Sequence, residues 1–150
     1  MATNGNQEHV HIEVPGEPRF LALIRSVMTM LAHAAGFPDS DVDKIELAVD
    51  EACANVMEHA YRNACPKPSV ELDIRWSPGR FVVDILDVGI PFDFSTYVPP
   101  KFPDHWLEGS TRGAGLYLIK ACMDETEYEP RQGRINRLRL VKHLQPAESE

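Results

Sequence analysis

The stretch ELAVDEACANVMEHAY, residues 46–61, decides the fold because it carries two patterns in one helix. Apolar residues recur at the 3.6-residue period of a helix that packs one face on a core, at Ile45, Ala48/Val49, Ala52/Cys53, Val56 and Ala60. Polar side chains recur at every fourth position, at Glu51, Asn55 and His59, on one flank of that apolar stripe. We therefore expect these three side chains at the seam between the core and the surface.

The segment before this stretch predicts a strand and a first helix. HVHIEV, residues 9–14, alternates apolar and polar residues as a half-buried strand does. From Phe20 to about residue 35 the apolar residues recur at helical spacing, and Gly36 and Pro38 are typical of a helix end. We predict that Ser40 or Asp41 caps the second helix, which continues to about Tyr61.

The segment after it predicts a hairpin, a long loop, a third helix and a last hairpin. VELDIRW (70–76) alternates strictly, and FVVDILDVG (81–89) is almost continuously apolar, which is typical of a central strand. Residues 90–112 have no period and contain four prolines, and a loop of this length is often a functional lid. GAGLYLIKACMDE (113–125) returns to helical spacing, and residues 126–144 indicate the last hairpin.

The order β-α-α-β-β-loop-α-β-β predicts an α+β fold, a two-layer sandwich of a mainly antiparallel sheet with helices on one face. The 150 residues suffice for one domain with a proper core, and we expect residues 1–8 and 146–150 to be frayed tails. Three cysteines without a CxxC pair indicate free thiols in a reducing compartment. No signal peptide or membrane span is visible, so we expect a cytoplasmic protein with no membrane partner.

The charge of the chain narrows the choice of partners. Fifteen Lys and Arg against 23 Asp and Glu give a net charge of −8, which argues against a general affinity for nucleic acid or an anionic membrane. One local basic cluster stands near the C-terminus, at Arg131, Arg134, Arg137 and Arg139. Its simplest interpretation is a solvated edge, and an acidic partner protein is the alternative.

Three groups of residues have the chemistry of a ligand site. Asn55 offers a neutral amide oxygen to a hard cation such as Mg²⁺, and Glu51, one turn earlier, could accept a proton from a hydroxyl. In DVGIPFD (87–93), Asp87 could accept a hydrogen bond from an exocyclic amine, Gly89 leaves room for a flat ring, and Pro91 follows. Each group has a plain alternative, a solvated helix flank for the first and an acidic turn at the end of a strand for the second.

The third group is STRGAGLYLI, residues 110–119, which leads into the predicted third helix. The first N–H groups of a helix have no internal partner and bind anions, and glycine lets a phosphate approach the main chain. Arg112 adds a positive charge beside Gly113, Ala114, Gly115 and Leu116. The plain alternative is a helix start with small residues for close packing. Taken in order along the chain, the three groups predict a cleft that binds a nucleotide.

This arrangement resembles the GHKL ATPase superfamily with its Bergerat ATP-binding fold, and within it the small anti-sigma-factor serine/threonine kinases of bacterial partner-switching systems. The resemblance extends from HVHIEVPGEPRFLALIRSVM (9–28) to LRLVKHL (138–144), and DEACANVMEHAY (50–61) is its most specific part. It implies ATP and Mg²⁺ as cofactors, an anti-sigma-factor antagonist as phosphoacceptor, a sigma factor or similar regulator as second partner, and a homodimer.

The resemblance also implies a role for each site residue. Glu51 would be the general base, Asn55 the Mg²⁺ ligand, and His59 a neighbour of the phosphates. Asp87 and Gly89 would hold adenine, whereas Arg112, Gly113 and Gly115 would surround the β- and γ-phosphates beneath a lid formed by residues 92–111. One departure is that the family's Gly-Thr-rich turn before the last strand, whose Thr helps to bind adenine, is replaced by QGRINRLRL (132–140).

Three other functions are compatible with parts of the sequence. A non-catalytic ATP-binding anti-sigma factor or regulatory binding module would use the same cleft, and Glu51 argues for catalysis against it. A detached histidine-kinase ATPase domain is disfavoured because no histidine stands in a phosphoacceptor context and such domains usually lack a Glu at this position. An α+β interaction module that binds no nucleotide would leave the three groups unexplained.

Overall fold

A computed structural model describes residues 6–92, 111–131 and 134–145 of the chain. The elements are β1 (Glu8–Pro15), the 3-10 turn η1 (Pro18–Phe20), α1 (Leu21–Ala34), α2 (Asp39–Asn55), the π-helical turn η2 (Val56–Ala60), β2 (Ser69–Ser77), β3 (Arg80–Asp87), α4 (Thr111–Cys122), β4 (Glu125–Glu129) and β5 (Asn136–His143). Their order confirms the predicted order. Most of the expected loop (90–112) and of the expected lid (92–111) lies outside the described residues, which exclude 93–110.

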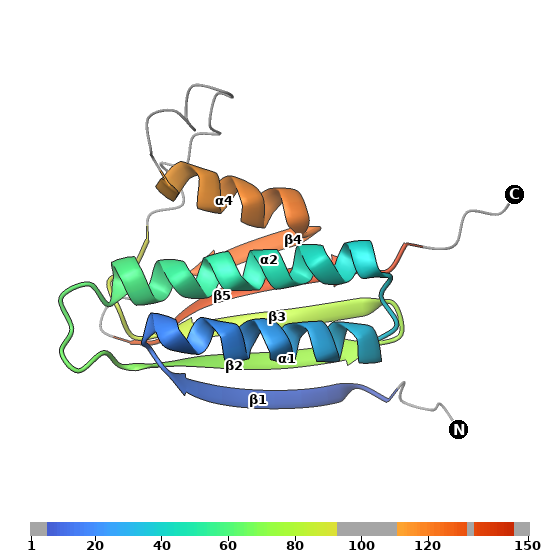
Figure 1. The fold of residues 1–150 in the computed structure, drawn as a ribbon, viewed down its shortest axis with the longest axis horizontal. Helices are drawn as coiled ribbons and strands as arrows, with labels where there is room; N and C mark the ends of the chain where they lie inside the picture. Colours follow the sequence, from blue (N-terminus) through green and yellow to red (C-terminus); the bar gives the residue numbers. More distant parts are fainter. Residues whose placement is uncertain (1–5, 93–110, 132–133, 146–150) are drawn as a thin grey trace, which may run out of the picture.

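The strands form one antiparallel sheet in the order β1-β2-β3-β5-β4, with β3 at its centre as its apolar sequence predicts. Helices α1, α2 and α4 cover one face of this sheet, and α2 packs between the other two helices (Figure 1). The predicted α+β two-layer sandwich is therefore confirmed.

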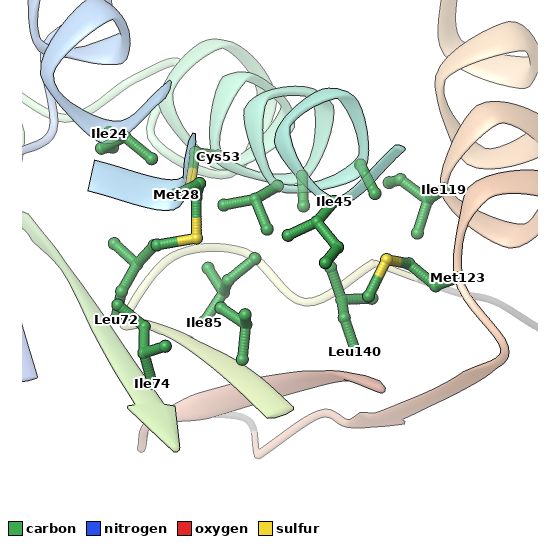
Figure 2. Close-up of a cluster of buried hydrophobic side chains, with 14 of the residues drawn as sticks. Ile24, Met28, Ile45, Cys53, Leu72, Ile74, Ile85, Ile119, Met123 and Leu140 are labelled. Atoms are coloured by element: carbon green, nitrogen blue, oxygen red, sulfur yellow. The ribbon is translucent and has the colours of Figure 1, made fainter. Parts of the chain in front are cut away.

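The core lies between the helices and the sheet. The inward residues of β2 and β3, such as Leu72, Ile74 and Ile85, meet the apolar stripes of the helices, and Figure 2 shows these side chains filling the space between the two layers. Cys53 and Cys122 are buried thiols, Cys65 is an exposed one, and all three are free.

The opposite face of the sheet is charged. Asp84, on the central strand, is only 5% exposed and accepts hydrogen bonds from Arg139 Nε and a terminal guanidinium nitrogen over 2.8 and 2.9 Å. Arg75 adds a third bond over 3.1 Å. Arg137 and Arg131 pair with Glu129 on β4, so three of the four arginines in the predicted basic cluster are engaged in ion pairs. The predicted solvated edge is therefore wrong for Arg137 and Arg139, which lie on the inner strand β5 with side chains only 23% and 27% exposed.

The start of α2 and both ends of α4 differ from prediction. Helix α2 begins at Asp39 behind Pro38, whose carbonyl accepts the N–H groups of Asp41 and Val42, so the predicted capping by Ser40 or Asp41 is wrong. Helix α4 begins at Thr111 and ends at Cys122, so both glycines lie inside the helix and its end is three residues earlier than predicted. A buried Lys142 explains this end, because its Nζ donates to the Cys122 carbonyl over 2.7 Å.

The largest difference is in the stretch that decides the fold. The α-helical hydrogen bonding of α2 ends at Asn55 and a wider π-helical turn follows, closed by a bond from the Tyr61 N–H to the Val56 carbonyl five residues earlier. Lys67 Nζ donates to the Met57 carbonyl inside that turn over 2.7 Å. Such turns are frequent at functional sites.

A smaller difference is that β1 already includes Glu8, so the N-terminal tail is shorter than expected.

Candidate nucleotide-binding site

A cavity of about 90 Å³ opens where α2, η2, β3, β5 and α4 meet. Its walls are mainly apolar and include Ile85, Leu138, Leu116 and Ile119 from β3, β5 and α4. Its polar lining residues are Asn55, His59, Arg62, Asp87 and Tyr128. Whole small-molecule sites measure roughly 300–1,000 Å³, so this cavity has room for one ring system and the rest of a ligand would extend beyond it.

The structure brings most of the predicted residues together. Asn55, His59, Asp87, Pro91 and Leu116 line the same cavity, although they come from segments up to 61 residues apart in the sequence (55 to 116). Gly89 and Gly115 border the residues of this cavity. Arg112, Gly113 and Ala114 lie in the first turn of α4, and their side chains are outside the described part of the structure, so their contact with phosphate stays a prediction.

Glu51 and Asn55 meet α4 at Gly115. A Cβ placed on Gly115 would stand 3.1 Å from Glu51 Oε2, 3.6 Å from Asn55 Nδ2 and 3.7 Å from Asn55 Oδ1. Glycine thus lets the main chain of α4 approach the carboxylate and the amide closely. Burial raises the pKa of Glu51, and the negative charges of Asp50 and Glu58 raise it further. A carboxylate with a raised pKa is a better proton acceptor.

Asp87, at the end of the central strand, is 7% exposed and held by two donors. The Gly89 N–H donates to its Oδ1 over 2.8 Å, and Asn136 Nδ2 donates to the same oxygen over 3.0 Å. Burial raises the pKa of Asp87, while these two hydrogen bonds act in the opposite direction. Among the described residues no donor reaches Oδ2, so this oxygen is left for a ligand in the cavity.

The space next to Gly89 is too small for the flat ring that the sequence predicted there. A Cβ on Gly89 would stand 2.7 Å from the Ala60 carbonyl oxygen, 2.7 Å from Ala60 Cβ and 2.8 Å from Tyr61 Cδ1. The Ile90 N–H donates to the same carbonyl over 3.2 Å. The space beside Gly89 that requires a glycine is thus filled by η2 and Tyr61. Adenine binding by Gly89 stays a prediction.

Sequence reasoning missed three residues that shape the site. Asn136 is fully buried and bonds to Asp87. Tyr61 lies between Gly16 and Gly89, donates its hydroxyl to the Ser69 carbonyl over 2.8 Å and accepts the Val88 N–H over 3.1 Å. Burial raises its pKa to about 12, so the hydroxyl keeps its proton. Tyr128 lines the cavity and accepts the Phe92 N–H over 2.9 Å. The register of β5 against β3 could have identified Asn136, because it pairs Asn136 with Asp87.

An antiparallel sheet with helices on one face, and a mainly apolar cavity that ends at the first turns of a helix, define an ATP-binding domain of the GHKL class. The chain belongs to the histidine kinase-like ATPase domain family, whose sequence pattern matches residues 14–142.

Two known proteins with similar sequences are bacterial kinases. The serine-protein kinase RsbW of Bacillus subtilis strain 168 is 30% identical over 137 residues, which cover 85% of this chain and 82% of that protein. RsbW of Bacillus thuringiensis strain Al Hakam is 27% identical over 150 residues, covering 95% and 89%. The expected enzyme class, a protein serine/threonine kinase, agrees with these names.

Solved structures support the fold. The RsbU and RsbW domains of Rv1364c from Mycobacterium tuberculosis match with a TM-score of 0.68 at 19% identity, over 93% of this chain and 34% of that one. The histidine kinase domain of the Erythrobacter litoralis EL346 blue-light activated histidine kinase matches with a TM-score of 0.54 at 17% identity, over 87% and 62%. Within the described residues, no helix has the length and apolar character needed to cross a membrane.

Proposed function

We propose that this protein is a serine/threonine kinase of a partner-switching system, which phosphorylates a small anti-sigma-factor antagonist and binds a sigma factor or a similar regulator. The observation that carries the proposal is the meeting of the Glu51 carboxylate and the Asn55 amide at Gly115, near the start of α4. The names of the relatives, serine-protein kinases, support the class of reaction, and the partners follow from the resemblance to the anti-sigma-factor kinases.

The residues fit ATP with Mg²⁺. The apolar walls of the cavity suit a flat base, and Asp87 Oδ2 suits its exocyclic amine. The first N–H groups of α4, which begins at Thr111, have no partner within a helix and suit the phosphates. Asn55 would supply one neutral oxygen to Mg²⁺, which takes much of its shell from phosphate and water. No group of three or more His, Cys, Asp or Glu that could hold a metal ion occurs in residues 6–92, 111–131 and 134–145. Bound Mg²⁺ supplies charge neutralisation at the β- and γ-phosphates.

The step assigned to the chain itself is proton transfer. The acceptor hydroxyl oxygen forms a bond to the γ-phosphorus, the bond from that phosphorus to the bridging oxygen of ADP breaks, and the hydroxyl proton passes to the Glu51 carboxylate. The raised pKa of Glu51 favours this role. The same feature argues against the alternative of a non-catalytic ATP-binding module.

The test compares Glu51→Gln with Glu13→Gln, which removes the same charge from an exposed position on β1. Proteins captured from the source cell with Mg·ATP are offered as phosphoacceptors with γ-labelled ATP. We expect the wild type and Glu13→Gln to form phosphoserine or phosphothreonine. We expect Glu51→Gln to lose about 100-fold or more of the rate, with ADP affinity within about twofold of the wild type because Glu51 is not needed to hold the base.

The general-base role of Glu51 fails if Glu51→Gln transfers phosphate at the wild-type rate, and the proposal of a kinase fails if the wild type transfers none. ATP binding without transfer to any captured protein would support the regulatory binding module instead. The absence of any heat on addition of Mg·ATP would exclude both. The homodimer, the cytoplasmic location and the lid formed by residues 92–111 stay predictions of the sequence.

A further inference from the structure

Asn136 is a fully buried amide at the first residue of β5, with 0% of its surface exposed. Its Nδ2 donates to Asp87 Oδ1 over 3.0 Å and to the Gly89 carbonyl over 3.0 Å. Its Oδ1 accepts the Arg131 N–H over 2.9 Å. An asparagine amide has two N–H donors, so these bonds use both of them.

Both hydrogen bonds that Asp87 accepts end on the same carboxylate oxygen, so its two oxygens have different surroundings. Oδ1 is held by Gly89 and Asn136, whereas Oδ2 receives no donor among the described residues. A carboxylate held at one oxygen keeps its rotamer, and the other oxygen is presented in a fixed place. Asp87 lines the apolar cavity, where a fixed acceptor discriminates strongly between a donor and an acceptor on the ligand.

The residue type at position 136 decides which hydrogen-bond donors are available to Asp87 and to a bound base. A threonine hydroxyl can turn and offer its proton either to the aspartate or to a ligand. The Asn136 amide is planar, its donors are spent on Asp87 and Gly89, and its oxygen is occupied by Arg131. Asn136 therefore fixes Asp87 and keeps no donor for the ring nitrogens of a base.

We propose that Asn136 is the positioning residue for base recognition, which holds Asp87 so that its free oxygen reads the exocyclic amine of a 6-aminopurine. Base recognition by Asp87 and Asn136 then depends on the exocyclic amine of the purine and not on the neighbouring ring nitrogen. The inference rests on the proposed nucleotide-binding function and names the residue that sets its base preference.

The test measures the affinity for ADP and for inosine diphosphate, which has a carbonyl in place of the amine, by calorimetry with Mg²⁺. The wild type is expected to prefer ADP by about 100-fold or more, since a site built to bond a donor rejects an analogue that lacks it. Asn136→Leu has a similar volume and no donor. We expect it to lose roughly 10- to 100-fold in ADP affinity, the equivalent of one hydrogen bond to a charged group, and to change by less than about threefold for inosine diphosphate.

A second variant separates positioning from a structural role. Asn136→Thr keeps one donor for Asp87 and is expected to recover most of the preference for ADP. If the Leu variant does not fold, Asn136→Val, which has the shape of threonine without its donor, is compared with Asn136→Thr in the same way.

Equal losses for both diphosphates in the Leu or Val variant would overturn the inference, because they would indicate a collapsed cavity. An unchanged ADP preference would overturn it as well. If the wild type binds neither diphosphate, the proposed function itself fails.

Discussion

Glu51 Oε2 lies 3.1 Å from the place that a Cβ of residue 115 would take. This distance is tighter than most contacts of real Cβ atoms, so a side chain at position 115 would push the Glu51 carboxylate by a few tenths of an ångström. The atom that has to yield is the far end of a flexible side chain and not the main chain. The contact therefore links the position of the proposed base to the glycine of α4 without making the fold depend on it.

Gly115→Ala is expected to fold and to lose activity. Alanine gains about 1 kcal/mol of helix propensity over glycine, which offsets the strain at Glu51. The displaced carboxylate should lower the rate of phosphoryl transfer by about 10- to 100-fold, as small misplacements of reacting groups do. Thermal unfolding should give a Tm equal to or above that of the wild type. A variant with the wild-type transfer rate would contradict this account of the contact.

Gly89→Ala is the matched glycine variant and should behave in the opposite way. Its Cβ would stand 2.7 Å from the Ala60 carbonyl oxygen, which belongs to the main chain of η2 and cannot rotate aside. Overpacking of this kind costs typically 1–3 kcal/mol. Urea unfolding should show that loss in Gly89→Ala, and a free energy of unfolding equal to the wild type would show that η2 yields readily.

Glu51→Gln should raise stability at neutral pH while it removes activity. The pKa of Glu51 is higher in the folded protein, through burial and then through Asp50 and Glu58. A carboxyl group of this kind favours the folded state at low pH, and the contribution is lost as the pH rises through the folded pKa. The Tm of Glu51→Gln should therefore exceed that of the wild type at about pH 7.5. The difference should shrink toward zero near pH 4 and below, where the wild-type carboxyl is protonated in both states. A Tm difference that stays constant with pH would show that Glu51 is not destabilised by its charge.

Much of the fold could be predicted because its elements follow local periods in the sequence. The alternation in β2 and the continuous apolar run of β3 reflect which faces are buried, and each is readable within a few residues. The start of α2 was missed because Pro38, an ordinary stop signal, acts there as the first acceptor of the helix. The π-helical turn was missed because it is accompanied by contacts from outside α2, such as the bond from Lys67 to the Met57 carbonyl.

The candidate site was predictable to the extent that its chemistry is carried by residue type. Asn55 and His59 form a polar row beside the apolar stripe of one helix, Asp87 ends an apolar strand, and all three line one cavity. Asn136 was not predictable in the same way, since its bond to Asp87 spans 49 residues and arises from strand pairing. The tight fit of Gly89 against Ala60 likewise depends on two elements that only the fold brings together.

The charged face of the sheet offers a test of stability that leaves the cavity untouched. Asp84 is buried beneath Arg139 and Arg75, and it lies on the face opposite the helices because it alternates along β3 with the core residues Val83 and Ile85. Removal of one partner from a buried pair costs about 3–5 kcal/mol, because a charge is left without compensation. We expect Arg139→Leu to lose about 3 kcal/mol of unfolding free energy, at the lower end because Arg75 still bonds to Asp84.

The double variant Asp84→Leu/Arg139→Leu should be more stable than the sum of the single variants predicts, by about 1 kcal/mol or more. ADP affinity should stay at the wild-type value in all three variants, since the cavity lies on the helical side of the sheet. Additive losses in urea unfolding would show that the two side chains contribute independently, and the geometry of their paired bonds would then have little bearing on stability.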